Sequence, residues 1–216
     1  MSIKKRGSPF VAALAALNFL LFSASAPVSA GSAAADPVAA IRLAGRTATV
    51  GQLQRDPWVM LAAAQILGRV VSMPAAAPAL ACSELTTAVP SGQWQTILSL
   101  PRIIAEAMAW SGWDRAAVMA TANRINGAVS TAIGGDRHRL AAGTALRCVV
   151  PGTIRALGIA GVDGDVRVAV RDHEGRDTAP DPEAAGSYQW LFAVRGLVLD
   201  LVNDGTGTAI VIIRTQ

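Results

Sequence analysis

The sequence predicts an α+β fold, with an N-terminal layer of about three helices packed on a C-terminal, mainly antiparallel sheet of five to six strands. Between residues 56 and 135, apolar residues recur every three to four positions, which is the spacing of amphipathic helices. From Thr144 onward they recur at every second position, which is typical of strands. Because runs of helix precede runs of strand, the pattern favours α+β over alternating βα units. We expect residues 31–216 to form one compact domain, with a helical half at 56–135 and a β-rich half at 136–216.

The first thirty residues have the pattern of a secretory signal peptide. A basic start, Lys4 to Arg6, precedes the apolar run Phe10 to Phe22, and the small residues before Ala30 fit a cleavage site. The alternative is an uncleaved anchor, but the apolar run is shorter than the roughly 20 residues that a membrane-spanning helix needs. We expect cleavage near Ala30, a periplasmic or secreted protein, and no membrane span after cleavage.

The charge of the chain changes when the signal peptide is removed. The whole sequence carries a formal charge of +4, which falls to +1 once the +3 of Lys4, Lys5 and Arg6 is subtracted. The remaining chain has no extended basic cluster, so we expect no nucleic-acid partner. An apolar fraction of 52% also excludes a disordered tail or a fibrous protein.

Three helices are predicted from their termini and apolar faces. Residues 31–55 are expected to be a flexible start with a short hairpin across Ile41–Val50. Asp56 and Pro57 are typical of a helix N-terminus, and Pro74 ends that helix. A second helix is expected to begin around residues 99–101 and to end at 111–112. A third is expected from a capping arrangement at residues 111–114 to the glycine pair at 134–135.

The β-rich half contains several strand patterns. Alternating apolar residues predict strands at 144–150, 166–171, 188–195, 197–202 and 209–214. The turn residues 203–207 predict that the last two strands form a hairpin. The final strand is apolar on both faces, so we expect it to be a covered inner strand.

The two cysteines are Cys82 and Cys148. In an oxidising compartment an even number of cysteines favours a disulfide, and two cysteines allow a single intramolecular pairing. A reactive thiol or a metal-binding thiol pair is the alternative, but neither cysteine belongs to a CxxC motif. We predict a structural disulfide that joins the helical half to the β-rich half.

Histidines and nearby carboxylates are the candidates for catalysis. His138 follows Asp136, and His173 follows Asp172, in segments predicted to be loops. If the two loops meet, these four side chains could provide a general base or a zinc site. The sequence lacks HExxH or any other ligand spacing on one element, and loop histidines beside charges are commonly only solvated. We therefore expect no cofactor and no metal.

Tryptophans provide the candidate binding residues. Trp94, Trp110 and Trp113 surround the second predicted helix, where they could line a ligand groove or an interface. The alternative is that they fill the junction between helices and sheet. The acidic segment 172–187 is longer than a hairpin requires and is a second candidate binding element.

The function hypothesis follows from the export signal and from missing catalytic motifs. The sequence contains no GxSxG nucleophile elbow and no GxxxxGK[ST] phosphate loop. The leading hypothesis is an exported bacterial envelope protein, a non-enzymatic binding or accessory domain for a protein or an envelope polymer. The alternative is a small periplasmic hydrolase, metal-assisted through His138, His173 and nearby carboxylates.

Overall fold

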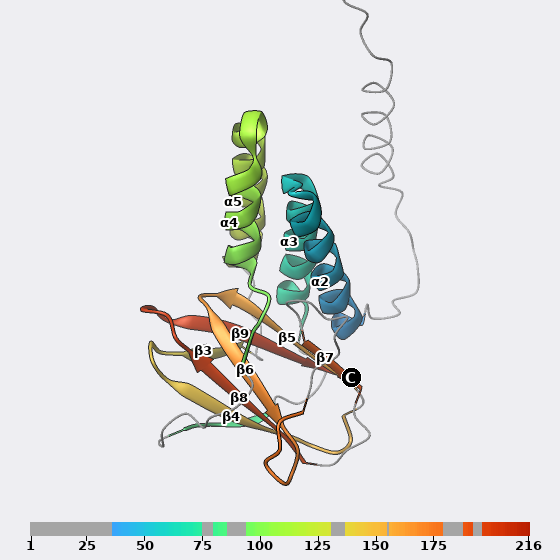
Figure 1. Ribbon diagram of the computed structural model, residues 1–216, viewed down its shortest axis with the longest axis vertical. Helices are drawn as coiled ribbons and strands as arrows, with labels where there is room; N and C mark the ends of the chain where they lie inside the picture. Colours follow the sequence, from blue (N-terminus) through green and yellow to red (C-terminus); the bar gives the residue numbers. More distant parts are fainter. Residues whose placement is uncertain are drawn as a thin grey trace, which may run out of the picture. The chain divides into compact units, whose positions relative to one another are not determined.

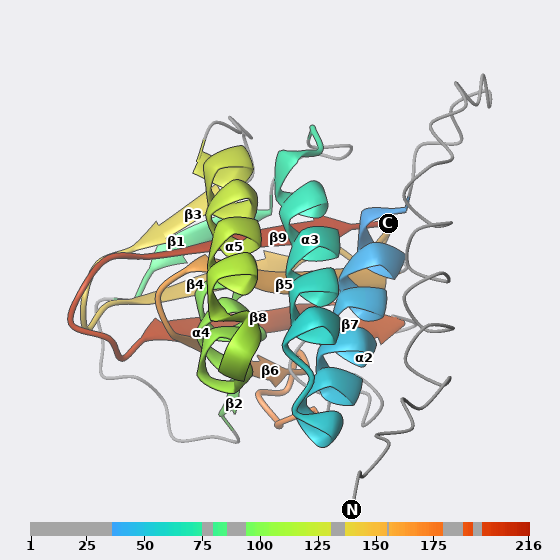
Figure 2. The same cartoon turned by 90° about the horizontal axis from the view of Figure 1, so that it is seen from above.

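Helices cover one face of two stacked antiparallel sheets in the computed structural model of the chain (Figures 1 and 2), which confirms the predicted α+β class. The structure describes residues 36–74, 80–85, 94–130, 137–154, 156–178, 188–191 and 196–216. The described residues from Asp36 to Gln216 belong to one compact unit. The predicted signal peptide lies outside the described residues.

The first described helix, α2 (Pro37–Gln54), corrects the expected hairpin. The Asp36 carboxylate accepts a hydrogen bond from the Val38 amide, and Pro37 occupies the first turn, where no amide donor is needed. The buried residues of α2 recur at helical spacing, which shows why the segment is helical despite its β-branched residues. They are Val38, Ile41, Ala44, Gly45, Ala48 and Gly51. The hairpin prediction for this segment was wrong.

Helix α3 (Pro57–Ser72) confirms the predicted start at Asp56 and Pro57. The Asp56 carboxylate accepts hydrogen bonds from the amides of Trp58 and Val59. At the other end, the Arg214 guanidinium donates to the carbonyls of Val70 and Met73 at 2.9 and 2.6 Å. This contact fixes the C-terminus of α3 to the last strand, where a cation also complements the helix dipole.

Helices α4 (Leu100–Trp110) and α5 (Arg115–Ser130) form a second helical pair, joined by the short 3-10 helix η1 (Gly112–Asp114). Helix α4 begins at Leu100, within the start predicted at residues 99–101, and the Ser99 hydroxyl caps it by accepting from the Arg102 amide. The Ser111 hydroxyl instead donates back to the Met108 carbonyl at 2.7 Å, so the expected capping arrangement is not formed there. The glycine pair at 134–135 lies outside the described residues.

The strands form two sheets rather than one. The first sheet has the order β1-β4-β8-β6-β2, the second has the order β3-β9-β5-β7, and all pairings of strands are antiparallel. The strands of the first sheet are β1 (Ala81–Glu84), β4 (Ala145–Val150), β8 (Leu197–Asn203), β6 (Val166–Arg171) and β2 (Gln95–Thr96). Those of the second are β3 (Arg137–Leu140), β9 (Ala209–Thr215), β5 (Ala156–Asp163) and β7 (Tyr188–Leu191).

The last two strands do not form the predicted hairpin. β8 pairs with β4 and β6, whereas β9 pairs with β3 and β5 in the other sheet. The turn between them therefore crosses from one sheet to the other. The Asn203 side chain holds this crossing, because its amide donates to the carbonyls of Leu140, Ala141 and Gly207.

Two apolar cores lie on opposite faces of the second sheet. One joins the helices to outward-facing residues of β5 and β9, such as Ala160 and Ile212. The other lies between the two sheets and contains Leu157, Val211 and Leu199. β9 is thus a covered inner strand, as predicted. No helix among the described residues is long and apolar enough to cross a membrane.

Candidate functional site

A groove of about 650 Å³ runs between the start of α4 and the turn that joins β5 to β6. Its polar lining comes from four separate segments of the chain. These side chains are Thr96, Arg102, Asp163, Asp165, Arg167 and Asp204. Apolar contributions come from Pro101, Ala105 and Val166. The groove therefore presents guanidinium donors and carboxylate acceptors side by side.

Arg167 is held in the groove from two sides. Its guanidinium forms a bidentate ion pair with the Asp204 carboxylate, with Nη2 donating to Oδ1 at 2.8 Å and Nε donating to Oδ2. The guanidinium also lies over the Trp94 ring, 5.5 Å from its centroid, at cation–π distance. The hydrogen bonds from Arg167 to Asp204 raise the pKa of Arg167 and lower the pKa of Asp204. The pair is charged at neutral pH, and Trp94 fixes its orientation.

Arg102 and two aspartates complete the polar lining. Arg102, in the first turn of α4, is half-exposed, and its Nε donates to Glu106 at 3.2 Å. Asp163 and Asp165 flank Gly164, whose positive φ of 71° forms the turn between β5 and β6. Asp165 is exposed, and Oδ1 of Asp163 accepts a hydrogen bond from the Gly164 amide. Both carboxylates thus retain acceptor capacity toward the groove.

The three tryptophans of the binding prediction lie in different environments. Trp94 is half-buried and contacts Arg167 at the groove. Trp110 is half-buried and packs against the core between helices and sheet. Trp113, in η1, is fully exposed. The described contacts thus place Trp94 at the groove, Trp110 in the helix–sheet junction and Trp113 on the surface.

Trp113 is one of three large apolar side chains that the structure leaves exposed where the helices end. Leu53 in the last turn of α2 is 82% exposed, and Trp58 in the first turn of α3 is 43% exposed. The turn after α2 and the turn after α4 lie at the same end of the helical layer (Figures 1 and 2). The exposure of Trp58 can be predicted from its place after Pro57, in the first turn of α3, where a side chain has little preceding helix to pack against.

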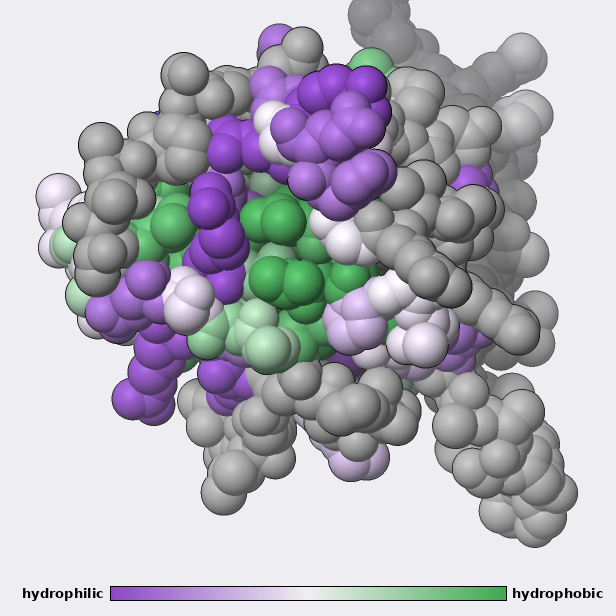
Figure 3. Space-filling model, turned by 90° about the horizontal axis from the view of Figure 1, so that it is seen from below, coloured by the Kyte–Doolittle hydropathy of each residue, from purple (hydrophilic) through white to green (hydrophobic). Residues whose placement is uncertain are grey.

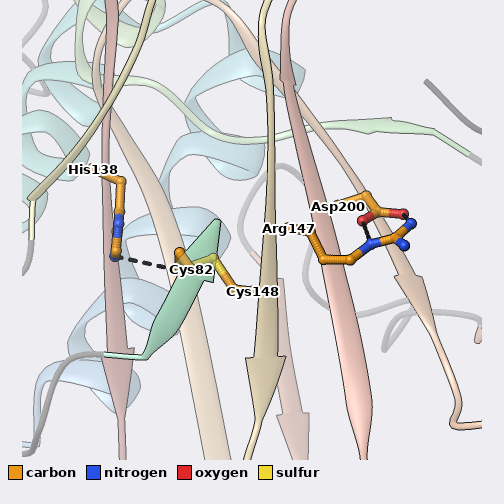
Figure 4. Close-up of a disulfide and its surroundings, with 5 residues drawn as sticks. All are labelled: Cys82, His138, Arg147, Cys148 and Asp200. Atoms are coloured by element: carbon orange, nitrogen blue, oxygen red, sulfur yellow. Dashed lines mark hydrogen bonds and ion pairs between the residues drawn. A yellow bond between two sulfur atoms is a disulfide. The ribbon is translucent and has the colours of Figure 1, made fainter. Parts of the chain in front are cut away.

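The disulfide joins Cys82 and Cys148, directly opposite residues of β1 and β4 (Figure 4). The pairing predicted from the sequence is therefore confirmed. His138 Nε2 lies 3.9 Å from Cys82 Sγ, and the imidazole points toward the disulfide in Figure 4. The structure corrects the expected position of His138, because it lies in strand β3 and faces the space between the two sheets, not in a loop.

His173 lies in the turn that follows β6, as predicted, and its Nε2 is 3.7 Å from Glu174. The described contacts therefore join His173 to Glu174 and His138 to the disulfide. Asp172 accepts hydrogen bonds from the backbone and side chain of Arg176, which lower its pKa. Asp136 lies outside the described residues. Across the described ranges, no three histidine, cysteine or acidic side chains lie together to hold a metal ion.

The outer face of the first sheet carries a buried ion-pair cluster. Asp200, fully buried, accepts hydrogen bonds from Arg147 on β4 and Arg171 on β6. Arg171 also pairs with Asp177, at 3.3 Å, in the first part of the acidic segment 172–187. Residues 179–187 of that segment lie outside the described residues. Figure 3 shows this side of the molecule, where hydrophilic side chains border a hydrophobic area.

Sequence reasoning did not find the groove, because its residues are far apart in the chain. Arg102, Arg167 and Asp204 meet only after α4 packs beside β6 and the β8–β9 turn. Among the sequence-predicted residues that the structure describes, Trp94 contacts the groove lining through Arg167. Comparisons with known proteins return no match, since no family model, no curated protein and no solved structure matches this chain.

Proposed function

We propose that this protein is exported to the bacterial envelope and acts there as a non-enzymatic binding domain, with a polymer of the envelope as its partner. The predicted signal peptide supports export, and the Cys82–Cys148 disulfide is compatible with an oxidising compartment. The groove beside Trp94 supports binding and is the observation that carries the proposal.

The lining of the groove fits a glycan, whose hydroxyl groups can donate to the aspartates and whose carboxylates can accept from the guanidinium groups. A guanidinium group recognises carboxylates through charge-assisted hydrogen bonds, and Arg102 and Arg167 provide two of them. Carboxylate oxygens accept hydrogen bonds from hydroxyl groups, and Asp163 and Asp165 provide these. Envelope polysaccharides present both hydroxyls and carboxylates along one chain. The open shape of the groove suits an extended polymer better than a small enclosed ligand.

A protein partner and a metal-assisted hydrolase are the rival functions. The hydrolase requires His138 and His173 in one site, whereas the described contacts join His138 to Cys82 and His173 to Glu174. A protein partner would bury a larger and more apolar surface than the charged groove offers. The polymer is therefore the partner that the groove favours.

The binding experiment titrates the purified protein with soluble acidic fragments of cell-wall glycan and follows the backbone amide resonances. Shifts should cluster at residues 96, 102 and 163–167, and Arg102→Ala should weaken the affinity by about tenfold through loss of a charge-assisted hydrogen bond. Arg124→Ala, an exposed arginine of α5, is the matched control and should bind normally. Unchanged resonances at the groove would exclude the polymer, and cleavage of the fragments would favour the hydrolase instead.

Export is tested separately. The N-terminal sequence of material recovered from the periplasm or the medium should begin near Gly31, after removal of residues 1–30. Recovery of the chain with Met1, in the membrane fraction, would instead show that the segment is an anchor.

A further inference from the structure

We infer that the polymer bound in the groove carries a primary ammonium group beside its carboxylates, and that Asp163 and Asp165 recognise this group. The inference rests on the proposed function, because it names a further chemical group of the polymer that the same groove binds. Arg102 and Arg167 remain the residues that recognise the carboxylates. The groove would thus select a polymer whose repeating unit has charges of both signs.

The charged side chains of the groove leave an excess of negative charge. Three aspartates and two arginines line the groove, so their formal charges sum to −1. Glu106, the ion-pair partner of Arg102, brings this sum to −2. A polymer that carried carboxylates alone would be repelled by this excess, whereas an ammonium group would neutralise part of it.

The excess charge belongs to Asp163 and Asp165. Both arginines of the groove already have a carboxylate partner. Within the described part of the chain, no cationic side chain pairs with either Asp163 or Asp165, and both are exposed. Oδ1 of Asp163 accepts from the Gly164 amide at 2.9 Å, but this donor carries no charge, so the aspartate remains an anion. The turn between β5 and β6 therefore presents two carboxylates without a counterion.

An ammonium group fits these two carboxylates better than a metal ion does. Calcium and magnesium take six or more oxygen ligands, whereas the described residues include no group of three acidic, histidine or cysteine side chains that could hold a metal. A primary ammonium group has three N–H donors, and the oxygens of Asp163 and Asp165 are enough to accept them. The groove is also large enough for an organic group, with a volume of about 650 Å³.

Arg102 retains donors for a carboxylate of the same polymer. Its ion pair with Glu106 uses Nε, at 3.2 Å, and neither Nη forms a hydrogen bond with a described residue. The side chain is 51% exposed, so a ligand can reach the two Nη groups. Planar guanidinium donors match the two oxygens of a carboxylate.

Backbone contacts keep Arg102 beside the turn between β5 and β6. The Gly161 amide donates to the Leu98 carbonyl at 2.9 Å, and the Ile97 amide donates to the Val166 carbonyl at 3.1 Å. These two bonds fix the segment before α4 to the strands on either side of the turn. One ligand can therefore contact the carboxylates of the turn and the guanidinium of α4 together.

The experiment measures the affinity for soluble cell-wall glycan fragments that carry free carboxylates and free primary amines, before and after N-acetylation of the amines. Acetylation removes the ammonium charge and leaves the hydroxyl and carboxylate groups in place. By isothermal titration calorimetry, acetylation should lower the affinity of the wild-type protein by about tenfold, as expected for loss of charge-assisted hydrogen bonds. Added salt should reduce this preference, because the carboxylates are exposed.

Asp163→Asn combined with Asp165→Asn should bind the two forms of the fragments with nearly equal affinity. Asparagine keeps an oxygen that can accept from the Gly164 amide, so the turn should be retained, and thermal unfolding checks this. Glu84→Gln is the matched control. It removes one exposed carboxylate that has no ion pair among the described residues, from β1, at the opposite edge of the first sheet from β2. This variant should prefer the amine form as strongly as the wild type does.

The outcomes separate this inference from the proposed function. If the wild-type protein binds native and N-acetylated fragments equally well, the polymer is still a ligand and the inference is overturned. A preference for the amine form that persists in the double variant also overturns it, because another site then recognises the ammonium group. If neither form of the fragments binds, the proposed function fails and the inference fails with it.

Discussion

Arg147 and Asp200 face each other directly across β4 and β8, with Arg147 Nε donating to Asp200 Oδ1 at 2.6 Å and Nη2 donating to Oδ2 at 2.9 Å. Arg171 Nη1 donates to the same carboxylate from β6, at 3.0 Å. One buried anion thus lies between two cations and connects three neighbouring strands. The hydrogen bond to Asp200 also raises the pKa of Arg147, so the guanidinium of this pair stays charged.

Replacement of Asp200 should therefore strongly destabilise the first sheet. Asp200→Ala leaves two guanidinium groups facing each other without the carboxylate that separates them, and loss of one partner from a buried ion pair costs about 3 kcal/mol or more. Urea denaturation measures this change in the free energy of unfolding. Asp204→Ala is the control, because its pair with Arg167 is solvent-exposed and contributes about 1 kcal/mol at most. Equal losses in the two variants would show that burial of Asp200 is not what makes its pairs important.

The disulfide should provide a separate contribution to stability. Cys82 and Cys148 are 66 residues apart in the sequence, and closing a loop of this length stabilises the fold by roughly 4 kcal/mol on the chain-entropy model. Reduction, or the double substitution of both cysteines by serine, should lower the free energy of unfolding by that order. Reductant should leave the double-serine variant unchanged. Alkylation of two thiols in the untreated native protein would contradict the disulfide itself.

The parts of the fold that the sequence predicts correctly depend on local signals. Asp56 and Pro57 cap α3 as predicted, because a side-chain oxygen and a missing amide donor act within one helical turn. The alternating patterns of β4, β6 and β8 are correct for a similar reason. Each of these strands has one face toward the core between the sheets and the other toward the outer face.

The parts that the sequence misses depend on distant contacts. β5 has no alternating pattern, because helices cover one face and the first sheet covers the other, so all its residues except Asp163 are buried. The turn after β8 looks like a hairpin turn, yet the pairing partners of β8 and β9 lie elsewhere in the chain. The groove was missed for the same reason, because Arg102 and Arg167 come together through packing and belong to no common sequence motif. The sequence identifies Trp94 only as an aromatic residue and does not predict its contact with Arg167.

Acid should weaken the link between β6 and the turn after β8. Because Arg167 lowers the pKa of Asp204 below its ordinary value, the folded state stabilises the charged carboxylate. That stabilisation is present above the ordinary pKa, about 4, and is lost as the pH falls through the lowered value. Asp204→Asn should therefore be less stable than the wild type at neutral pH, by about 1 kcal/mol at most, and equal to it in strong acid.

Thermal unfolding across this pH range measures the difference. Asp165→Asn is a suitable control, because Asp165 is an exposed carboxylate of the same groove and forms no ion pair with the residues that the structure describes. A difference between Asp204→Asn and the wild type that stays constant into acid would contradict the assigned cause.

Two glycines should respond in opposite directions to substitution by alanine. A Cβ at Gly161 in β5 would lie 2.8 Å from Ser99 Cβ and 3.2 Å from Ser99 Cα. The Gly161 amide donates to the Leu98 carbonyl at 2.9 Å, so the segment before α4 cannot move away without losing that bond. Gly161→Ala should cost about 1–3 kcal/mol of stability, as overpacking does in a tight contact. Since α4 starts at this contact and supplies Arg102, glycan affinity should fall as well.

Gly127, inside α5, has open space around its Cα, so alanine there should stabilise the helix by about 0.5–1 kcal/mol. Chemical denaturation of both variants measures the two signs, and a stable Gly161→Ala protein would show that the close approach of β5 to α4 is not needed.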